Sequence, residues 1–185
     1  MIGYAFCGSF CTLSASLKIL KELSSNEDIL PIMSDAVYET DTRFWTADNF
    51  KKEVIAITGR EPIHTIKDAE PLGPKVPLDA LIISPCTGNT LSKMANAITD
   101  TTVTMAAKAH LRSDRPLLIA LASNDAMSAN LKNIASLLLR KNVYFVPMKQ
   151  DDPLSKPHSL VCDFSLLIPS YQMMKSHAQP RPLFL

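Results

Sequence analysis

Short apolar runs alternate with amphipathic stretches along most of the chain. The runs predict strands at residues 2–7, 28–34, 79–84, 117–122 and 143–146. Leu13, Leu17 and Leu20 follow the first run at the spacing of one helix face. Further helices are expected at 46–58, after the third strand to about residue 98, and at 101–112, 128–140 and 161–177.

Proline positions refine this pattern. Pro31 lies inside the second predicted strand. Because proline has no N–H group to donate to a neighbouring strand, we expect either that this strand is at a sheet edge or that Pro31 lies early in it. Residues 60–78 contain four prolines and Gly73, which predicts a long surface loop. A proline-flanked tail is expected over residues 178–185.

Strands that alternate with helices predict one α/β domain over residues 1–185. The expected architecture is a three-layer sandwich, in which helices cover both faces of a central parallel sheet of about five to six strands. Such sheets bind ligands at the carboxyl ends of their strands.

Composition and charge exclude several classes of function. Hydrophobic residues make up 46% of the chain, charged residues 20%, and the net charge is +1. A nearly neutral chain does not attract nucleic acid or an anionic membrane. No stretch approaches the ~20 apolar residues of a membrane span, and the first residues do not resemble a signal peptide. We therefore expect a soluble, cytoplasmic protein.

The four cysteines favour reduced thiols over a disulfide framework, because a chain of this size does not need one. Cys7 and Cys11 are spaced C-x-x-x-C, but the nearest histidine in sequence is His64, and neither C-x-x-C nor H-x-x-x-H spacing occurs. Thiols in the core or in loops are the better interpretation, and no metal site is expected.

Small polar residues follow the first four predicted strands. These clusters are Gly8-Ser9, Ser34-Asp35, Thr87 to Thr90, and Ser123-Asn124-Asp125. In a parallel sheet all four fall on one edge, so we expect them to form a binding site. Gly8-Ser9 suits a terminal phosphate at a helix N-terminus, although it could be a plain capping turn. Thr87, Asn89 and Asn124-Asp125 could likewise be caps.

Three basic side chains are candidates for binding an anionic substrate. Lys156 and His158 lie in one polar segment, and Arg43 lies close to Trp45, the only tryptophan. Arg43 could bind a carboxylate with two hydrogen bonds, or it could simply be a surface residue at a helix start. A surface position is also the commoner case for a histidine.

Residues 84–90, Ser-Pro-Cys-Thr-Gly-Asn-Thr, resemble the Pro-Ala-Ser-Ala-Asn-Thr segment of the FMN-binding flavoprotein family, which includes the cysteine-type decarboxylases. Gly8-Ser9 resembles the first phosphate loop of that family, and Ser34 its second-strand hydroxyl. Segments 70–75, 105–108, 123–125, and 150–153 with Lys156-Pro157 resemble one branch, the B subunits of dipicolinate synthase. This resemblance covers nearly the whole chain.

The resemblance implies a Rossmann-like, flavodoxin-like fold and an oxidoreductase subunit with bound FMN. It implies oxidation of dihydrodipicolinate, a small dicarboxylate, to dipicolinate during sporulation in the mother cell of a spore-forming bacterium. NAD(P) would enter only through a nicotinamide-binding companion subunit that resembles the A subunit. A homo-oligomer is also implied.

The same resemblance assigns residue roles. Gly8, Ser9 and Phe10 would bind the FMN phosphate. The ribityl chain or ring edge would contact Ser34, Thr87, Gly88, Asn89 and Thr90. Asn124 would contact the ring or substrate, and Arg43, Lys156 and His158 the substrate carboxylates. No catalytic residue is identified.

Two alternatives remain open: a non-catalytic, flavodoxin-like structural partner, and an FMN-dependent cysteine-type decarboxylase. Against the decarboxylase, residues 122–127 lack the Pro and Trp of the decarboxylase motifs Pro-x-Met-Asn and Met-Trp. In addition, a proline-rich insertion separates His64 from the third strand.

Overall fold

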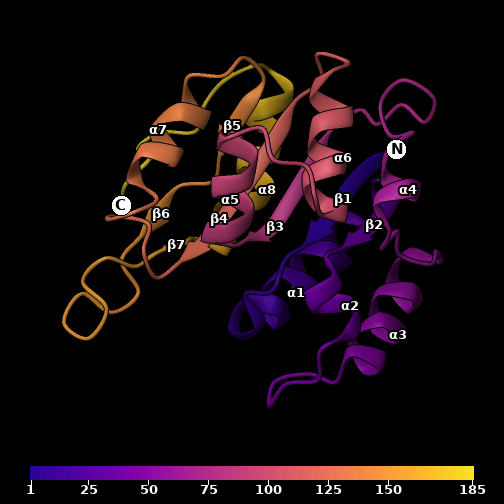
Figure 1. Cartoon of the computed structure of the whole chain (residues 1–185), viewed down its shortest axis with the longest axis horizontal. Coiled ribbons are helices and arrows are strands. Elements are labelled where there is room, and N and C mark those ends of the chain that lie inside the picture. The colour runs from indigo at the N-terminus through magenta and orange to yellow at the C-terminus, as the bar shows by residue number, and fades with distance from the viewer.

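The computed structural model describes residues 1–185, and its centre is a seven-stranded sheet (Figure 1). Five strands are parallel and follow the order β2-β1-β3-β4-β5. They are β1 (Ile2–Phe6), β2 (Ile29–Met33), β3 (Leu81–Cys86), β4 (Leu117–Ser123) and β5 (Val143–Phe145). Two short antiparallel strands, β6 (Met148–Lys149) and β7 (Leu160–Cys162), extend the sheet from the end of β4.

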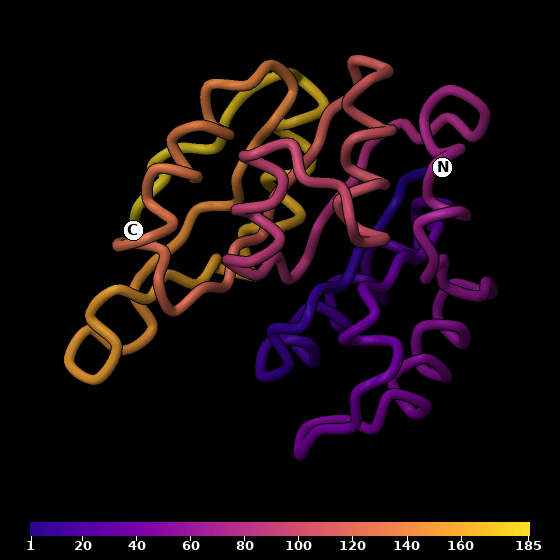
Figure 2. The backbone as a smooth tube through the Cα atoms, viewed as in Figure 1, coloured from indigo at the N-terminus to yellow at the C-terminus, as the bar shows by residue number.

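Helices cover both faces of this sheet (Figures 1 and 2). One face packs against α4 (Ile66–Ala69), α5 (Gly88–Ala95), α6 (Thr102–Leu111) and α7 (Leu131–Leu138). The other packs against α1 (Leu13–Leu23), α2 (Asp35–Glu39), α3 (Ala47–Thr58) and α8 (Leu167–Lys175). Short 3₁₀ turns, η1 (Phe10–Thr12) and η2 (Phe164–Leu166), precede α1 and α8.

Alternation along the strands separates two apolar cores. Tyr4 and Phe6 of β1 belong to the core under α1, α3 and α8, whereas Ala5 and the following Cys7 belong to the core under α5, α6 and α7. Strands buried on both faces read as continuous apolar runs, and for this reason the sequence located all five parallel strands. The predicted three-layer α/β architecture is confirmed.

Local residue types account for the position of β2 and for both ends of α3. β2, which contains Pro31, is the outermost strand of the parallel part. The Thr46 hydroxyl accepts from the Asn49 N–H at the start of α3. Gly59 ends the same helix with φ 68°, a left-handed conformation that glycine adopts without strain.

The helix predicted over 161–177 is wrong in its first part. Residues 160–162 form β7, and α8 begins only at Leu167. Leu160 and Val161 pair with Ser123 and Ala122, the last residues of β4. The sheet therefore has two strands more than the parallel set, and its antiparallel part continues from the end of β4.

The proline-rich segment 60–78 is not only the predicted surface loop. It contains α4, and Ile63 bridges to Ile32 beside the sheet. Leu72 and Leu78 are completely buried in one of the cores. Apolar residues between the prolines therefore pack the segment against the sheet. A smaller correction concerns β3, which continues through Pro85 to Cys86 although the proline was expected to end it.

No helix of the structure combines the length and the apolar character needed to cross a bilayer.

Candidate functional site

An open cleft of about 570 Å³ lies where β1, β3 and β4 end. Its walls are the turns that follow these strands and two loops, one at Arg43 and Phe44 and the other at Asp151 and Lys156. Most of the predicted polar clusters therefore do meet at one edge of the sheet.

The turn after β1 leaves several hydrogen-bonding groups free. The N–H groups of Gly8, Phe10 and Cys11 have no acceptor in the chain. Ser9 Oγ accepts from Thr12 Oγ1 at 3.0 Å but does not cap the helix that follows. Free backbone donors at the start of a helix favour an anion, because the helix dipole is positive there.

Ser34 extends this first turn. Its N–H donates to Phe6 O at 3.0 Å, which places it beside the end of β1. Its hydroxyl is buried and has no hydrogen-bond partner, although Ser34 occupies the N-cap position of α2. Buried hydroxyls are nearly always bonded, so the Ser34 Oγ has a free hydrogen-bonding capacity close to the first turn.

The turn after β3 is held by hydrogen bonds between its own side chains, although the N–H groups of Gly88 and Asn89 have no acceptor in the chain. The Thr87 hydroxyl accepts from the Thr90 N–H at 3.2 Å and donates to Thr90 Oγ1 at 3.1 Å. Thr90 Oγ1 in turn donates to Cys7 Sγ at 3.4 Å. Thr90 is therefore part of the wall that joins β3 to β1 and does not line the cleft. Asn89 faces a neighbouring polar groove instead.

Gly88 is required by the close approach of the turn after β4. A Cβ atom there would collide with Ser123 Oγ and would lie 2.7 Å from Asn130 Nδ2 and 2.8 Å from Asp125 Oδ1. These three side chains are bonded to one another: Ser123 Oγ and Asn130 Nδ2 both donate to Asp125 Oδ1. The hydrogen bond from Ser123, aided by Asn130, lowers the pKa of Asp125. The cleft therefore has a fixed negative charge on this wall.

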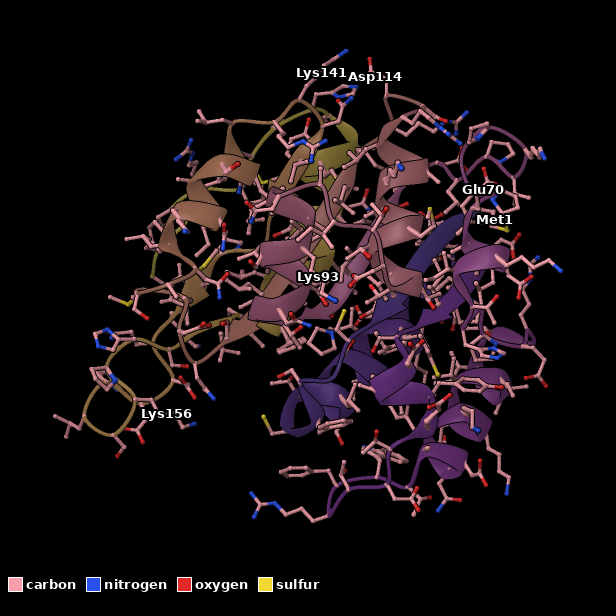
Figure 3. All side chains as sticks on the ribbon, viewed as in Figure 1. Met1, Glu70, Lys93, Asp114, Lys141 and Lys156 are labelled. Carbon is pink, nitrogen blue, oxygen red and sulfur yellow. The ribbon has the colours of Figure 1, made fainter.

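Two cations also line the cleft, on segments far apart in sequence. The Arg43 guanidinium stacks over the Phe44 ring, 4.8 Å from its centroid. Lys156 lies on the loop that projects at the lower left of Figure 3 and forms a 3.0 Å ion pair with Asp151. His158 is exposed and does not line the cleft.

The structure thus brings together most of the predicted site residues. Those that line the cleft are Gly8, Ser9, Phe10, Thr87, Gly88, Asn124, Arg43 and Lys156. Ser34 lies beside the first turn, whereas Asn89, Thr90 and His158 are outside the lining. The sequence assigned no role to the lining residues Cys11, Thr12 and Phe44, although each is within two residues of one that it did select.

Other reactive side chains are not available to this cleft. Burial raises the pKa of Cys7 to about 11 and raises the pKa values of Cys86 and Cys162 as well, so these thiols stay protonated. His64 stacks face to face on Tyr38, with ring centroids 3.8 Å apart, and does not line the cleft. No cluster of three or more His, Cys, Asp or Glu side chains is arranged for a metal ion.

A flavodoxin-like sheet with an anion-binding first turn is typical of proteins that bind a flavin mononucleotide. The sequence profile of the flavoprotein family matches residues 2–166, and the chain belongs to this family.

The B subunit of dipicolinate synthase from Bacillus subtilis (strain 168) is 40% identical over 185 residues, covering 100% of this chain and 92% of the relative. The crystal structure of the corresponding dipicolinate synthase chain from Bacillus halodurans has 36% identity and a TM-score of 0.91, covering 100% of this chain and 95% of that chain. The FMN-dependent cysteine decarboxylase SpaF shares the fold, with a TM-score of 0.71 at 22% identity, over 95% and 96% of the two chains.

Proposed function

We propose that the chain is the FMN-binding B subunit of a dipicolinate synthase, which oxidises dihydrodipicolinate to pyridine-2,6-dicarboxylate during sporulation. The observation that carries the proposal is the 40% identity with the Bacillus subtilis protein along the whole chain. A nicotinamide-binding companion chain completes the enzyme in the mother-cell cytoplasm. Assembly into a homo-oligomer remains a prediction.

The residues of the first turn fit the FMN phosphate. The free N–H groups of Gly8, Phe10 and Cys11 and the Ser9 hydroxyl supply donors at the positive end of a helix. The unpaired Ser34 hydroxyl supplies a further bond to the phosphate or to a ribityl hydroxyl.

The turn after β3 fits the flat part of the cofactor. Thr87 and Gly88 would run along the ring, since both residues line the cleft. Asn124 would contact the ring or the substrate. When bound, FMN supplies an acceptor for a hydride, as does a nicotinamide in the companion chain.

The charges of the cleft fit a dicarboxylate. Arg43 and Lys156 would each bind one substrate carboxylate, Lys156 by exchanging its ion pair with Asp151, whereas Asp125 repels carboxylates from its own wall. This arrangement orients the dihydropyridine ring between the two sides of the cleft. Converting the ring to a pyridine removes one hydride and one proton, so the substrate must be held where both can leave.

Reconstitution with the companion chain tests the proposal. Ser9→Glu places a carboxylate where the phosphate would bind, and we expect the formation of pyridine-2,6-dicarboxylate to fall to background. Ser25→Glu, on an exposed turn after α1, is the matched control and should leave the rate unchanged. Full activity of Ser9→Glu would instead support the role of a structural partner with a vestigial pocket.

Substrate binding is tested separately from cofactor binding. Arg43→Ala and Lys156→Ala should each raise KM about tenfold, because each removes a charge-assisted hydrogen bond, and should leave FMN binding intact. Unchanged KM values would place the dicarboxylate elsewhere in the complex.

A further inference from the structure

A second hollow, of about 340 Å³, lies between the end of α5, the outer side of α6 and the residue Arg140 beyond α7. Its lining shares no residue with the cleft at the strand ends. Met94, Ile98 and Leu111 form an apolar floor, and three basic side chains, Lys108, Arg112 and Arg140, surround it. The proposed reaction uses none of these residues, and the family resemblance, which includes segment 105–108, assigns no role to Lys108.

The three positive charges have no counter-charge in the chain. None of Lys108, Arg112 and Arg140 forms an ion pair, and the two nearby acids have other partners. Asp100 pairs with Lys93 at 2.8 Å, and Asp114 pairs with Lys141, as Figure 3 shows at the upper edge of the molecule. Three cations that share one hollow repel one another, and a bound anion would relieve that repulsion.

One side of the hollow, at the end of α5, is held by contacts within the chain. Ala97 has φ 58°, and the Ile98 N–H donates back to Lys93 O at 2.9 Å, so the chain turns sharply after α5. This turn leaves Ile98 46% exposed within the lining. Arg140 Nη1 donates to Met94 O at 3.4 Å, which holds the guanidinium over the end of α5. A site arranged in advance loses less entropy when it binds a ligand.

We propose that this hollow binds a small organic acid, with carboxylates on Arg112 and Arg140 and an apolar or aromatic body on Met94, Ile98 and Leu111. Guanidinium groups match the geometry of carboxylates, and Lys108 adds a third charge. The volume lies at the lower end of the range of about 300–1,000 Å³ for small-molecule sites. An inorganic anion would leave the apolar floor unused. The site is independent of the proposed function.

Calorimetric titration of the full chain with isophthalate, an aromatic dicarboxylate, tests the proposal. We expect a site that depends on Arg112 and Arg140, separate from the binding in the cleft that the proposed function expects and that R43A would weaken. Binding of glutarate to the hollow should be weaker, and binding of inorganic phosphate slight. The double variant R112A/R140A should weaken isophthalate binding at least tenfold. K18A/K21A, on the exposed face of α1, removes the same charge and should bind as the wild type does.

Several results would overturn the proposal. Equal loss in K18A/K21A would mean that isophthalate responds only to net charge, and loss in R43A alone would place it in the cleft at the strand ends. Absence of binding to the wild-type chain would refute the site directly. A change in oligomeric state of R112A/R140A, with isophthalate affinity unchanged, would identify the hollow as a protein interface.

Discussion

The turns after β1 and β3 look alike in sequence, since each places a glycine beside hydroxyl residues, but the structure uses them differently. After β1, backbone N–H groups are free and the neighbouring Ser34 hydroxyl is unpaired. After β3, Thr87 and Thr90 bond to each other, and Gly88 fits tightly against the turn after β4. The N–H groups of Gly88 and Asn89 also lack an acceptor, so the two turns differ in their side chains: those of the second turn fix one wall of the cleft, whereas an unpaired hydroxyl lies beside the first.

Of the substitutions that test this difference between the two turns, Gly88→Ala should have the largest effect on stability. Its Cβ would force Ser123, Asp125 and Asn130 apart, and we expect a loss of about 2–3 kcal/mol of unfolding free energy in urea denaturation. Gly8→Ala is the matched control: the nearest atom to its Cβ would be Ala36 Cβ at 3.3 Å, so stability should change by less than about 1 kcal/mol. Equal stability of the two variants would contradict the assigned roles.

Ser34→Ala should separate ligand binding from stability. Its hydroxyl has no partner, so removing it should leave the ligand-free chain as stable as before, or more stable by up to about 1 kcal/mol. FMN affinity should fall about three- to tenfold.

Ser16→Ala provides the contrast for Ser34. Ser16 Oγ is buried and donates to Ser84 O at 2.6 Å, so its loss should cost about 1–2 kcal/mol. Thermal denaturation with and without FMN measures the stability of both variants and its increase on FMN binding. A large destabilisation by Ser34→Ala without ligand would show that its hydroxyl is a structural group.

Asp125→Asn should have the smallest effect. The hydrogen bond from Ser123 lowers the folded-state pKa of Asp125, so its stabilising contribution is present above the unfolded-state pKa of about 3.9 and is lost as pH falls through the folded value. Because the side chain is exposed, we expect only a few tenths of a kcal/mol. Urea denaturation at pH 7 and at pH 3 should show the difference between wild type and variant shrinking in acid; a constant difference would argue against an ionised Asp125.

The sequence predicted the parallel sheet because its strands are buried on both faces and their apolar runs are continuous. The sequence did not predict β7, because a strand of three residues is too short to show a recognisable alternation of apolar and polar positions. Residues 160–162 are extended only since they pair with the end of β4. Likewise, the prolines of segment 60–78 predicted a loop, whereas contacts from elsewhere in the fold bury Leu72 and Leu78.

Those parts of the candidate site that depend on neighbouring residues in the sequence could be predicted. Glycine and hydroxyl residues after strands located the turns, and Gly8, Ser9 and Gly88 do line the cleft. Which hydroxyls remain free depends on partners far away in sequence. Thr90 donates a hydrogen bond to Cys7, and Asp125 belongs to the hydrogen-bonded group that packs against Gly88. No local sequence pattern predicts either contact.

Titration of the purified chain with FMN, followed by quenching of the flavin fluorescence, tests the central claim most directly. The wild-type chain and Ser25→Glu should quench FMN saturably with the same affinity, and Ser9→Glu should not quench it at all. Addition of the companion chain should leave this order unchanged. Wild-type protein that does not quench FMN, with or without its companion, or Ser9→Glu that binds as the wild type does, would contradict a flavin site at the first turn.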